Sequence, residues 1–229
     1  MTACDNSQTP NRNRPGKVIW VEKTTDMAAE ERGIDAVPEE DGIFLQWYKL
    51  SDRDIRYYNV YRKNVNEGFF SKIRQIDAGA TAGRDTTFID SDPVLNITNE
   101  YYIAAENSDG LQGVASDTIA YKLLDKAETS SPNSDIQGLP IFFWSLAYVS
   151  VQPDSFILRI EQDFPPYDLH FARKFQSDYQ YDPQVLNLSD VPDRPDFEID
   201  RWYKWRIDLI GTNILSSGSE SQYLRFRIN

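Results

Sequence analysis

The chain has 229 residues, of which 40% are hydrophobic and 13% aromatic, enough to build one large or two ordinary packed domains. Its formal net charge of −12 argues against nucleic acid or an anionic lipid surface as the main partner. Because Cys4 is the only cysteine, no disulfide can form within the chain.

Residues 1–16 are polar and lack apolar periodicity, which predicts a flexible tether. Near their start, Thr2 and Ala3 precede Cys4, and this pattern resembles the end of a bacterial lipoprotein signal. The basic and apolar parts of such a signal are missing, so we expect Met1 to stand where the signal was removed. The resemblance implies acyl chains on Cys4 and a lipid-anchored location in the cell envelope, at the outer membrane or cell surface. The alternative is a cysteine without a role in an unstructured terminus.

Seven short segments, separated by turn residues, predict antiparallel strands between residues 17 and 125. The expected strands are 17–21, 42–47, 55–62, 69–76, 86–90, 99–105 and 116–124. Between the first two strands, residues 27–32 have room for only one helical turn. Seven short strands in a segment of this length indicate an immunoglobulin-like sandwich.

Several residues in these strands form a recognisable pattern. It comprises Trp47 at the end of the second strand, Tyr58, Val60, Tyr61 and Arg62 in the third, residues 87–90 in the fifth, and Tyr101, Tyr102, Ala105, Asn107 and Gly110 in the sixth. The pattern resembles a fibronectin type III domain of the form found on bacterial cell surfaces. That family places a corner tyrosine where this chain has Asn99, so the corner hydrogen bond is either absent or made by Tyr101 in a shifted register.

Residues 126–138 are polar, with clustered Ser, Pro and Asn, and predict an interdomain linker. Beyond it, residues 139–229 resemble a second immunoglobulin-like or fibronectin type III-like domain. Its expected strands are 140–144, 155–161, 202–208 and 221–228. Residues 163–200 carry five prolines and many aromatic residues, which predicts a long functional loop with a helical turn or two at 169–175. The expected fold class is all-β, with two tandem immunoglobulin-like (fibronectin type III-type) β-sandwiches.

Catalytic chemistry finds little support in the sequence. The only histidine is His170, and although Asp168 lies nearby, no Gly-x-Ser-x-Gly sequence presents a serine nucleophile. One cysteine and one histidine cannot build a four-ligand structural zinc site. We therefore expect a protein that is not an enzyme and has no cofactor other than calcium. A hydrolase that uses residues 163–200 is the least favoured alternative.

Two groups of residues are candidates for ligand binding. Asp85, Asp90 and Asp92 offer hard carboxylate oxygens for calcium, with solvated acids at the turn of an edge strand as the alternative. The candidates for stacking on a glycan, or for contacting a partner, are the aromatic residues Tyr167, Tyr179, Tyr181 and Trp202. Aromatic residues in a sandwich also serve as core or loop packing, which is the alternative for this second group.

These expectations combine into a functional hypothesis. The resemblances imply a non-catalytic, lipid-anchored cell-envelope protein that acts in adhesion, or as a binding or structural module of a surface assembly. Its partners would be other cell-envelope proteins, with the membrane held through Cys4. The alternative is a carbohydrate-binding accessory module that uses the exposed aromatic residues of the second domain.

Overall fold

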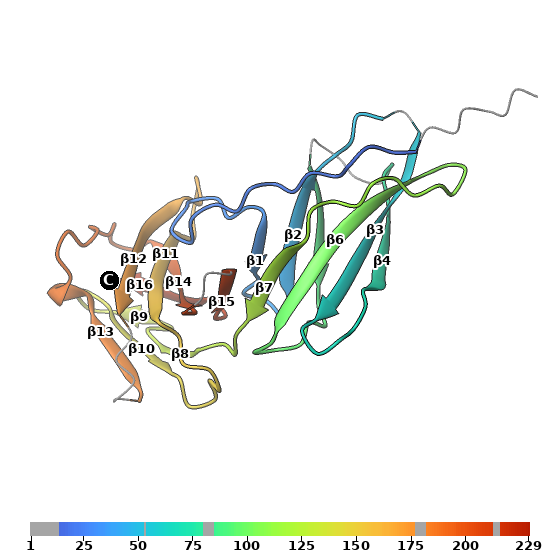
Figure 1. Cartoon of the computed structure of the whole chain (residues 1–229). Helices are drawn as coiled ribbons and strands as arrows, with labels where there is room; N and C mark the ends of the chain where they lie inside the picture. Colours follow the sequence, from blue (N-terminus) through green and yellow to red (C-terminus); the bar gives the residue numbers. More distant parts are fainter. Residues whose placement is uncertain (1–13, 53, 80–84, 177–181, 213–215) are drawn as a thin grey trace, which may run out of the picture.

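The computed structural model describes residues 14–52, 54–79, 85–176, 182–212 and 216–229. In these ranges the regular elements are strands, apart from one short 3-10 turn, η1 (Leu188–Asp190). They form two lobes placed end to end (Figure 1). The first domain comprises β1 to β7 and the second β8 to β16, so the expected all-β fold of two tandem sandwiches is confirmed.

Two sheets pack face to face in the first domain. One has the order β1-β2-β5, from β1 (Ile34–Ala36), β2 (Ile43–Tyr48) and β5 (Asp85–Asp90). The other has the order β4-β3-β6-β7, from β3 (Ile55–Asn64), β4 (Ser71–Asp77), β6 (Thr98–Asn107) and β7 (Ile119–Leu123). Trp47 is fully buried between them and meets the ring of Tyr58 edge-on at 5.7 Å. These three- and four-stranded sheets follow the fibronectin type III arrangement.

The edge of the first sheet is interrupted by residues 22–33, which we call the excursion. Trp20 pairs with Trp47 on β2, the chain then leaves the sheet, and β1 returns to pair Ile34 with Leu45. The backbone N–H of Thr24 donates to the carbonyl of Arg32 at 3.3 Å, which closes the neck of the excursion. No helix forms at residues 27–32, which the sequence had shown to be long enough for one helical turn at most.

Asn99 takes the place of the corner tyrosine in the first domain. It is fully buried, its amide donates to the carbonyls of Val94 (2.9 Å) and Ile97 (3.0 Å), and its oxygen accepts from the N–H of Val94 at 3.2 Å. Tyr101 instead donates to the carboxylate of Asp90 at 2.7 Å. The corner is therefore present, and its side chain is Asn99 rather than a shifted tyrosine.

The second domain has a tyrosine corner of the usual kind. The hydroxyl of Tyr203 accepts from the N–H of Glu198 at 3.0 Å, five residues upstream, as Val94 lies five residues upstream of Asn99. This shared spacing identifies β6 and β14 as equivalent strands of the two domains.

The second domain also has two sheets. One has the order β13-β10-β8, from β8 (Glu128–Ser131), β10 (Ile141–Ser145) and β13 (Gln184–Asn187). The other is built from β11 (Ser155–Gln162), β12 (Leu169–Gln176), β14 (Trp202–Ile210), β15 (Ser216–Glu220), β16 (Leu224–Ile228) and the short β9 (Asp135–Ile136). Phe142, Trp144 and Trp205 fill the core between them.

Two segments expected to be irregular contain strands. Residues 126–138, predicted as a linker, hold β8 and β9, whose side chains are exposed or half-buried and, apart from Ile136, polar, so they give no apolar alternation. Within 163–200, residues expected to make a helical turn form β12, and β13 follows. β12 is an edge strand with most of its side chains half-buried, which weakens its period-2 signal.

Gly33 makes the neck of the excursion possible, and its replacement tests the geometry. Its φ is +88°, and a Cβ there would lie 2.8 Å from backbone atoms of Lys23 and Val21. We expect Gly33→Ala to lower the free energy of unfolding by at least about 2 kcal/mol, because positive φ and a backbone clash act together.

The measurement is chemical unfolding followed by circular dichroism. Gly68→Ala is the matched control, since Gly68 has open space around it, and we expect a change within about 0.5 kcal/mol. Equal stabilities of the two variants would contradict the geometry of the neck.

Candidate functional site

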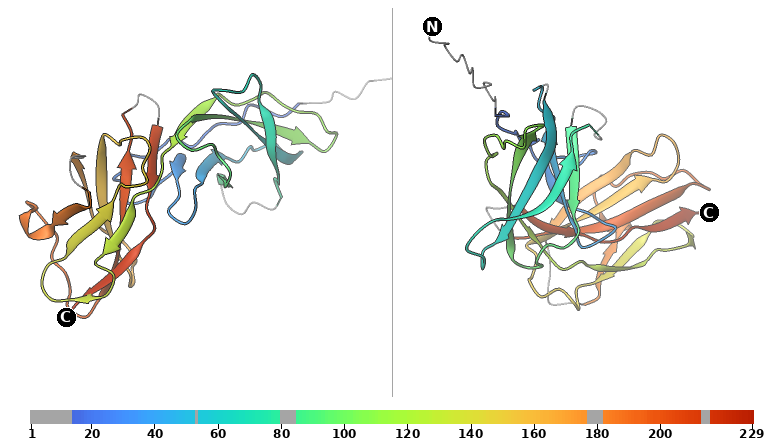
Figure 2. Two further views of the ribbon diagram at one scale, coloured as in Figure 1. Left: turned by 90° about the horizontal axis from the view of Figure 1, so that it is seen from below. Right: turned by 90° about the vertical axis from the view of Figure 1, so that its right-hand side faces the viewer.

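The two domains share one sheet at their junction. β7 of the first domain pairs in parallel with β15 of the second, with Tyr121 opposite Ser216 and Leu123 opposite Gly218. The N–H of Leu124 extends this ladder by donating to the carbonyl of Gly218 at 3.0 Å. The four-stranded sheet of the first domain thus continues into a ten-stranded sheet that crosses the junction. Figure 2 shows the two lobes meeting at this edge from two further directions.

The excursion of the first domain binds two buried arginines of the second. Arg159 on β11 and Arg206 on β14 are each 2% exposed, and in Figure 1 the excursion (blue) reaches from the first domain to β11. Arg159 donates to the carbonyls of Ala28 and Ala29 at 2.9 and 3.0 Å. Arg206 donates to both carboxylate oxygens of Glu31 at 2.7 and 2.8 Å. These contacts cross between domains and are charge-assisted, which makes them strong hydrogen bonds.

Further carboxylates of the second domain complete the surroundings of Arg206. Its guanidinium donates to Asp208 and is paired with Glu220, at 2.7 and 2.8 Å. Oxygens of Glu31, Asp208 and Glu220 lie within 4.8 Å of one another, a spacing that would also suit a metal ion. Here the guanidinium of Arg206 contacts all three and supplies the positive charge. The cluster is therefore an ion network centred on an arginine.

Glu161 plays the corresponding part for Arg159. It accepts from Arg159 at 2.9 Å, from the hydroxyl of Tyr223 at 2.7 Å, and is paired with Lys204 at 2.9 Å. Burial would raise the pKa of Glu161, but the hydrogen bonds from Lys204, Arg159 and Tyr223 lower it to about 2. Glu161 is thus a fixed negative charge.

Asp208 and Glu220 behave in the opposite way. Burial raises the pKa of both carboxyls, and the positive charge of Arg206 lowers it only in part because Glu31 and the two acids also repel one another. Burial likewise raises the pKa of Asp35, although it is paired with Lys23 and accepts from the hydroxyl of Tyr121 at 3.1 Å. We call the shared ladder of β7 and β15, together with the ion network around Arg159 and Arg206, the joint. Burial in the joint favours the protonated forms of Asp208, Glu220 and Asp35.

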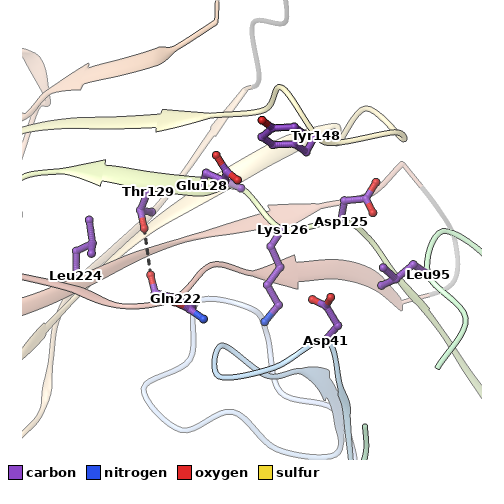
Figure 3. A pocket seen from close by; sticks show the side chains of 10 residues that line it. Asp41, Leu95, Asp125, Lys126, Glu128, Thr129, Tyr148, Gln222 and Leu224 are labelled. Carbon is purple, nitrogen blue, oxygen red and sulfur yellow. Dashed lines mark hydrogen bonds between the residues drawn. The ribbon is translucent and has the colours of Figure 1, made fainter. Parts of the chain in front are cut away.

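An open groove of about 520 Å³ lies beside this joint (Figure 3). It is lined by Asp41 and Leu95 of the first domain and by Tyr148, Gln222 and Leu224 of the second domain. Residues 125–129, which we call the connection because they join the two domains, complete the lining. The amine of Lys126 reaches from the groove to the carbonyls of Val37 and Pro38 at 2.5 and 3.1 Å, and burial lowers its pKa.

Asp125 holds the two walls of the groove together. Its carboxylate accepts from the amide of Asn96 in the first domain at 3.0 Å and from the N–H of Ser150 in the second at 2.7 Å. Burial acts to raise the pKa of Asp125, but the hydrogen bonds from Ser150 and Asn96 outweigh it and lower the pKa. Tyr148 is 73% exposed at the rim, so the groove offers one large aromatic surface beside its carboxylates.

The structure does not gather the residues of the predicted calcium site. Asp85 and Asp90 stand at opposite ends of β5, and the side chain of Asp85 is outside the described part. Both oxygens of Asp90 accept from Arg62, at 3.0 and 2.8 Å, and the carbonyl of Asp92 accepts from the same guanidinium. Asp90 thus holds a cation from the protein itself, and calcium binding stays a prediction.

Of the predicted glycan or partner residues, two are described. Tyr167 is 63% exposed in the turn between β11 and β12. Trp202 begins β14 at the same end of the domain, where its carbonyl accepts from the N–H of Asp163 at 3.0 Å. Arg225 and Arg227 lie over its ring at 5.0 and 5.1 Å, which uses the surface a sugar would need. Cys4, Tyr179 and Tyr181 lie outside the described residues, and the glycan site stays a prediction.

His170 has a packing environment. Its Nε2 lies 2.8 Å from the carbonyl of Asp196, and its ring contacts those of Phe197 and Tyr203 at 5.1 and 4.9 Å. Burial lowers the pKa of His170, so its neutral form is favoured.

The residues of the joint were not predicted from the sequence, although one feature of the sequence indicates two of them. Arg159 interrupts the otherwise apolar run FILRI, and Arg206 stands between Trp205 and Ile207, both in segments expected to be strands. A charge inside such a run is rarely buried unless it is paired. Nothing in the sequence pattern connects either arginine with Glu31, which lies more than a hundred residues earlier.

No protein-family model matches the chain, and no curated protein matches its sequence. Among solved structures, it is similar to the crystal structure of the FN1–FN3 domains of chicken CNTN1, at 12% identity and a TM-score of 0.34. The similarity covers 94% of this chain and 67% of that one. At this level it adds no argument, and the assignment of the fold rests on the strand order. The described part of the chain contains no helix with the length and apolar character needed to cross a membrane.

Substitution of Glu31 tests how strongly its contact with Arg206 stabilises the protein. We expect Glu31→Ala to lower the free energy of unfolding by about 2 kcal/mol, because it removes two charge-assisted hydrogen bonds from the buried Arg206. Unfolding in urea measures the effect. Glu30→Ala is the matched neighbour, since its side chain is 82% exposed, and it should leave stability unchanged. A loss of the same size in both variants would show that Glu31 has no special part.

Proposed function

We propose that this protein is a non-catalytic, lipid-anchored module of a cell-envelope assembly, where it acts as a structural element and binds another envelope protein. The observation that supports this is the joint. Domains in tandem move relative to each other by default, since their interfaces are small and polar. Here a shared sheet and a buried ion network join them, which favours a rigid spacer with a surface at a fixed orientation.

The position of the described N-terminal residues agrees with anchoring through Cys4. The N–H of Gly16 donates to Asp52 at 2.9 Å, and a Cβ on Gly113 would meet the carbonyl of Pro15 at 2.2 Å. These contacts lie at the end of the first domain that is remote from the second (Figure 1). A membrane anchor upstream would therefore leave the second domain and the groove pointing outwards.

The groove is the surface we propose for the partner. Both domains line it, so its shape depends on the joint. Its exposed Tyr148 supplies the kind of aromatic anchor that dominates many protein interfaces, and the carboxylates around it supply a polar rim.

Anchoring is tested by the intact mass of the protein purified from its native membrane. We expect a mature chain that begins at Cys4 and carries added acyl mass, and we expect Cys4→Ser to abolish both the added mass and membrane association. An unmodified chain that still carries Met1 would contradict the anchor and the envelope location together.

Partner binding is tested by a photo-crosslinking amino acid placed at Tyr148 in intact cells. We expect one discrete adduct that disappears in the Cys4→Ser background, because the protein would no longer reach its partner. The control position is Val185, which is 56% exposed on β13, at the opposite edge of the sheet that contains β8. Equal adducts at both positions, or none at Tyr148, would contradict binding at the groove.

A further inference from the structure

The joint holds more buried negative charge than its cations balance. Glu31, Asp208 and Glu220 surround the guanidinium of Arg206, and their oxygens lie within 4.8 Å of one another. Glu31 is also paired with Arg159 at 3.4 Å, whereas Arg206 is the only guanidinium that contacts Asp208 and Glu220 among the described residues. Asp208 and Glu220 are 4% exposed. Carboxylates at this separation and this depth cannot all ionise, since the second and third charges meet strong repulsion in a medium of low dielectric.

Among the described residues, the neighbouring cations are already engaged by other groups. The groups that face this cluster are Asp26 and Glu31 of the excursion, Asp35 of β1, Tyr121 of β7, Lys126 of the connection, Arg159 of β11, and Arg206 and Asp208 of β14. Arg159 is engaged by the carbonyls of the excursion, by Glu161 and by Glu31 itself. Lys126 donates to two backbone carbonyls of the first domain.

The three carboxylates do not belong to one domain. Glu31 comes from the first domain, whereas Asp208 and Glu220 come from the second. Repulsion among them therefore acts across the interface. A proton on one of the two acids of the second domain lowers this repulsion and leaves the bidentate contact between Glu31 and Arg206 in place.

We propose that the joint is a proton-operated latch, which holds the domains together while Asp208 or Glu220 carries a proton and loosens when both are ionised. The proposal is independent of the anchor and of the partner.

The direction of the effect follows from proton linkage. Burial raises the pKa of Asp208 and of Glu220, so the docked form keeps protons that an exposed carboxyl group would have lost. Docking then weakens as pH rises from the ordinary carboxyl range through the raised pKa values. Glu161, whose pKa is lowered, acts in the opposite direction, but only below the ordinary carboxyl range.

The test is the distance between labels on the two domains of the purified full-length chain. In a Cys4→Ser background, Lys72→Cys on β4 and Val185→Cys on β13 place both labels on exposed positions. Double electron–electron resonance gives the distance distribution from about pH 5 to about pH 10, the value to which the pKa of Glu220 is raised. We expect one narrow distribution at the acidic end and a reversible broadening as the pH rises.

Two variants assign the transition to the cluster. Glu220→Gln keeps an oxygen that accepts from Arg206 but cannot ionise, and Asp208→Asn does the same at the other acid. We expect either variant to move the broadening upward by at least about one pH unit or to abolish it. Asp135→Asn is the control, since its exposed pair with Arg227 lies outside the joint, and its transition should match that of the parent.

Three results would overturn the proposal. These are a distance distribution that does not change over the pH range, a transition that is the same in both variants and the parent, and one that Asp135→Asn shifts equally. Circular dichroism verifies the fold of each variant, and if one of the two fails to fold, the other decides.

Discussion

Two arginines that lie directly opposite each other in a sheet impose the main physical constraint on this molecule. Arg159 on β11 pairs with Arg206 on β14, and both are almost fully removed from solvent. Like charges at opposed positions repel, and their burial carries a desolvation cost unless anions and hydrogen-bond acceptors surround them. The other contacts at the junction supply these anions and acceptors.

The second domain meets the requirement only in part. It supplies Glu161 to Arg159, and Asp208, Glu220 and the hydroxyl of Tyr223 to Arg206. The remaining acceptors come from the first domain, as the carboxylate of Glu31 and the carbonyls of Ala28 and Ala29. The excursion therefore supplies hydrogen-bond acceptors that the second domain lacks. This contribution explains why the first strand of the sandwich is interrupted by residues 22–33.

The same contacts determine where a partner can bind. The shared ladder between β7 and β15 fixes the domains along one edge, and the excursion fixes them at the arginines. The groove lies beside these contacts and takes its walls from both domains, with Asp125 hydrogen-bonded to each. A change in the protonation of the joint would therefore alter the groove without any change in the residues that line it.

The two sandwiches could be predicted from the amino-acid sequence. Alternation in β2, β3, β6, β11 and β14 is strong because each has one face in a core, and the tryptophans and tyrosines of these strands identify the sandwich type. The sequence did not reveal β1, β8, β9, β12 and β13, which are short or lie at sheet edges, where burial on one face is too weak to impose a period of two. It also did not reveal β15, whose Ser, Gly and Glu residues give no apolar alternation. The sequence also did not predict that Asn99 makes the corner hydrogen bonds, since an amide can replace a tyrosine there only in the folded geometry.

The contacts between the domains, in contrast, could not be predicted from the sequence. Glu31 and Arg206 are 175 residues apart, and a surface charge and a buried charge read alike in a sequence. What joins them is the register of β15 against β7 and the length of the excursion, both of which are properties of packed domains. Local periodicity reports which face of a strand is buried, and it carries no information on which other part of the chain will neutralise a charge there.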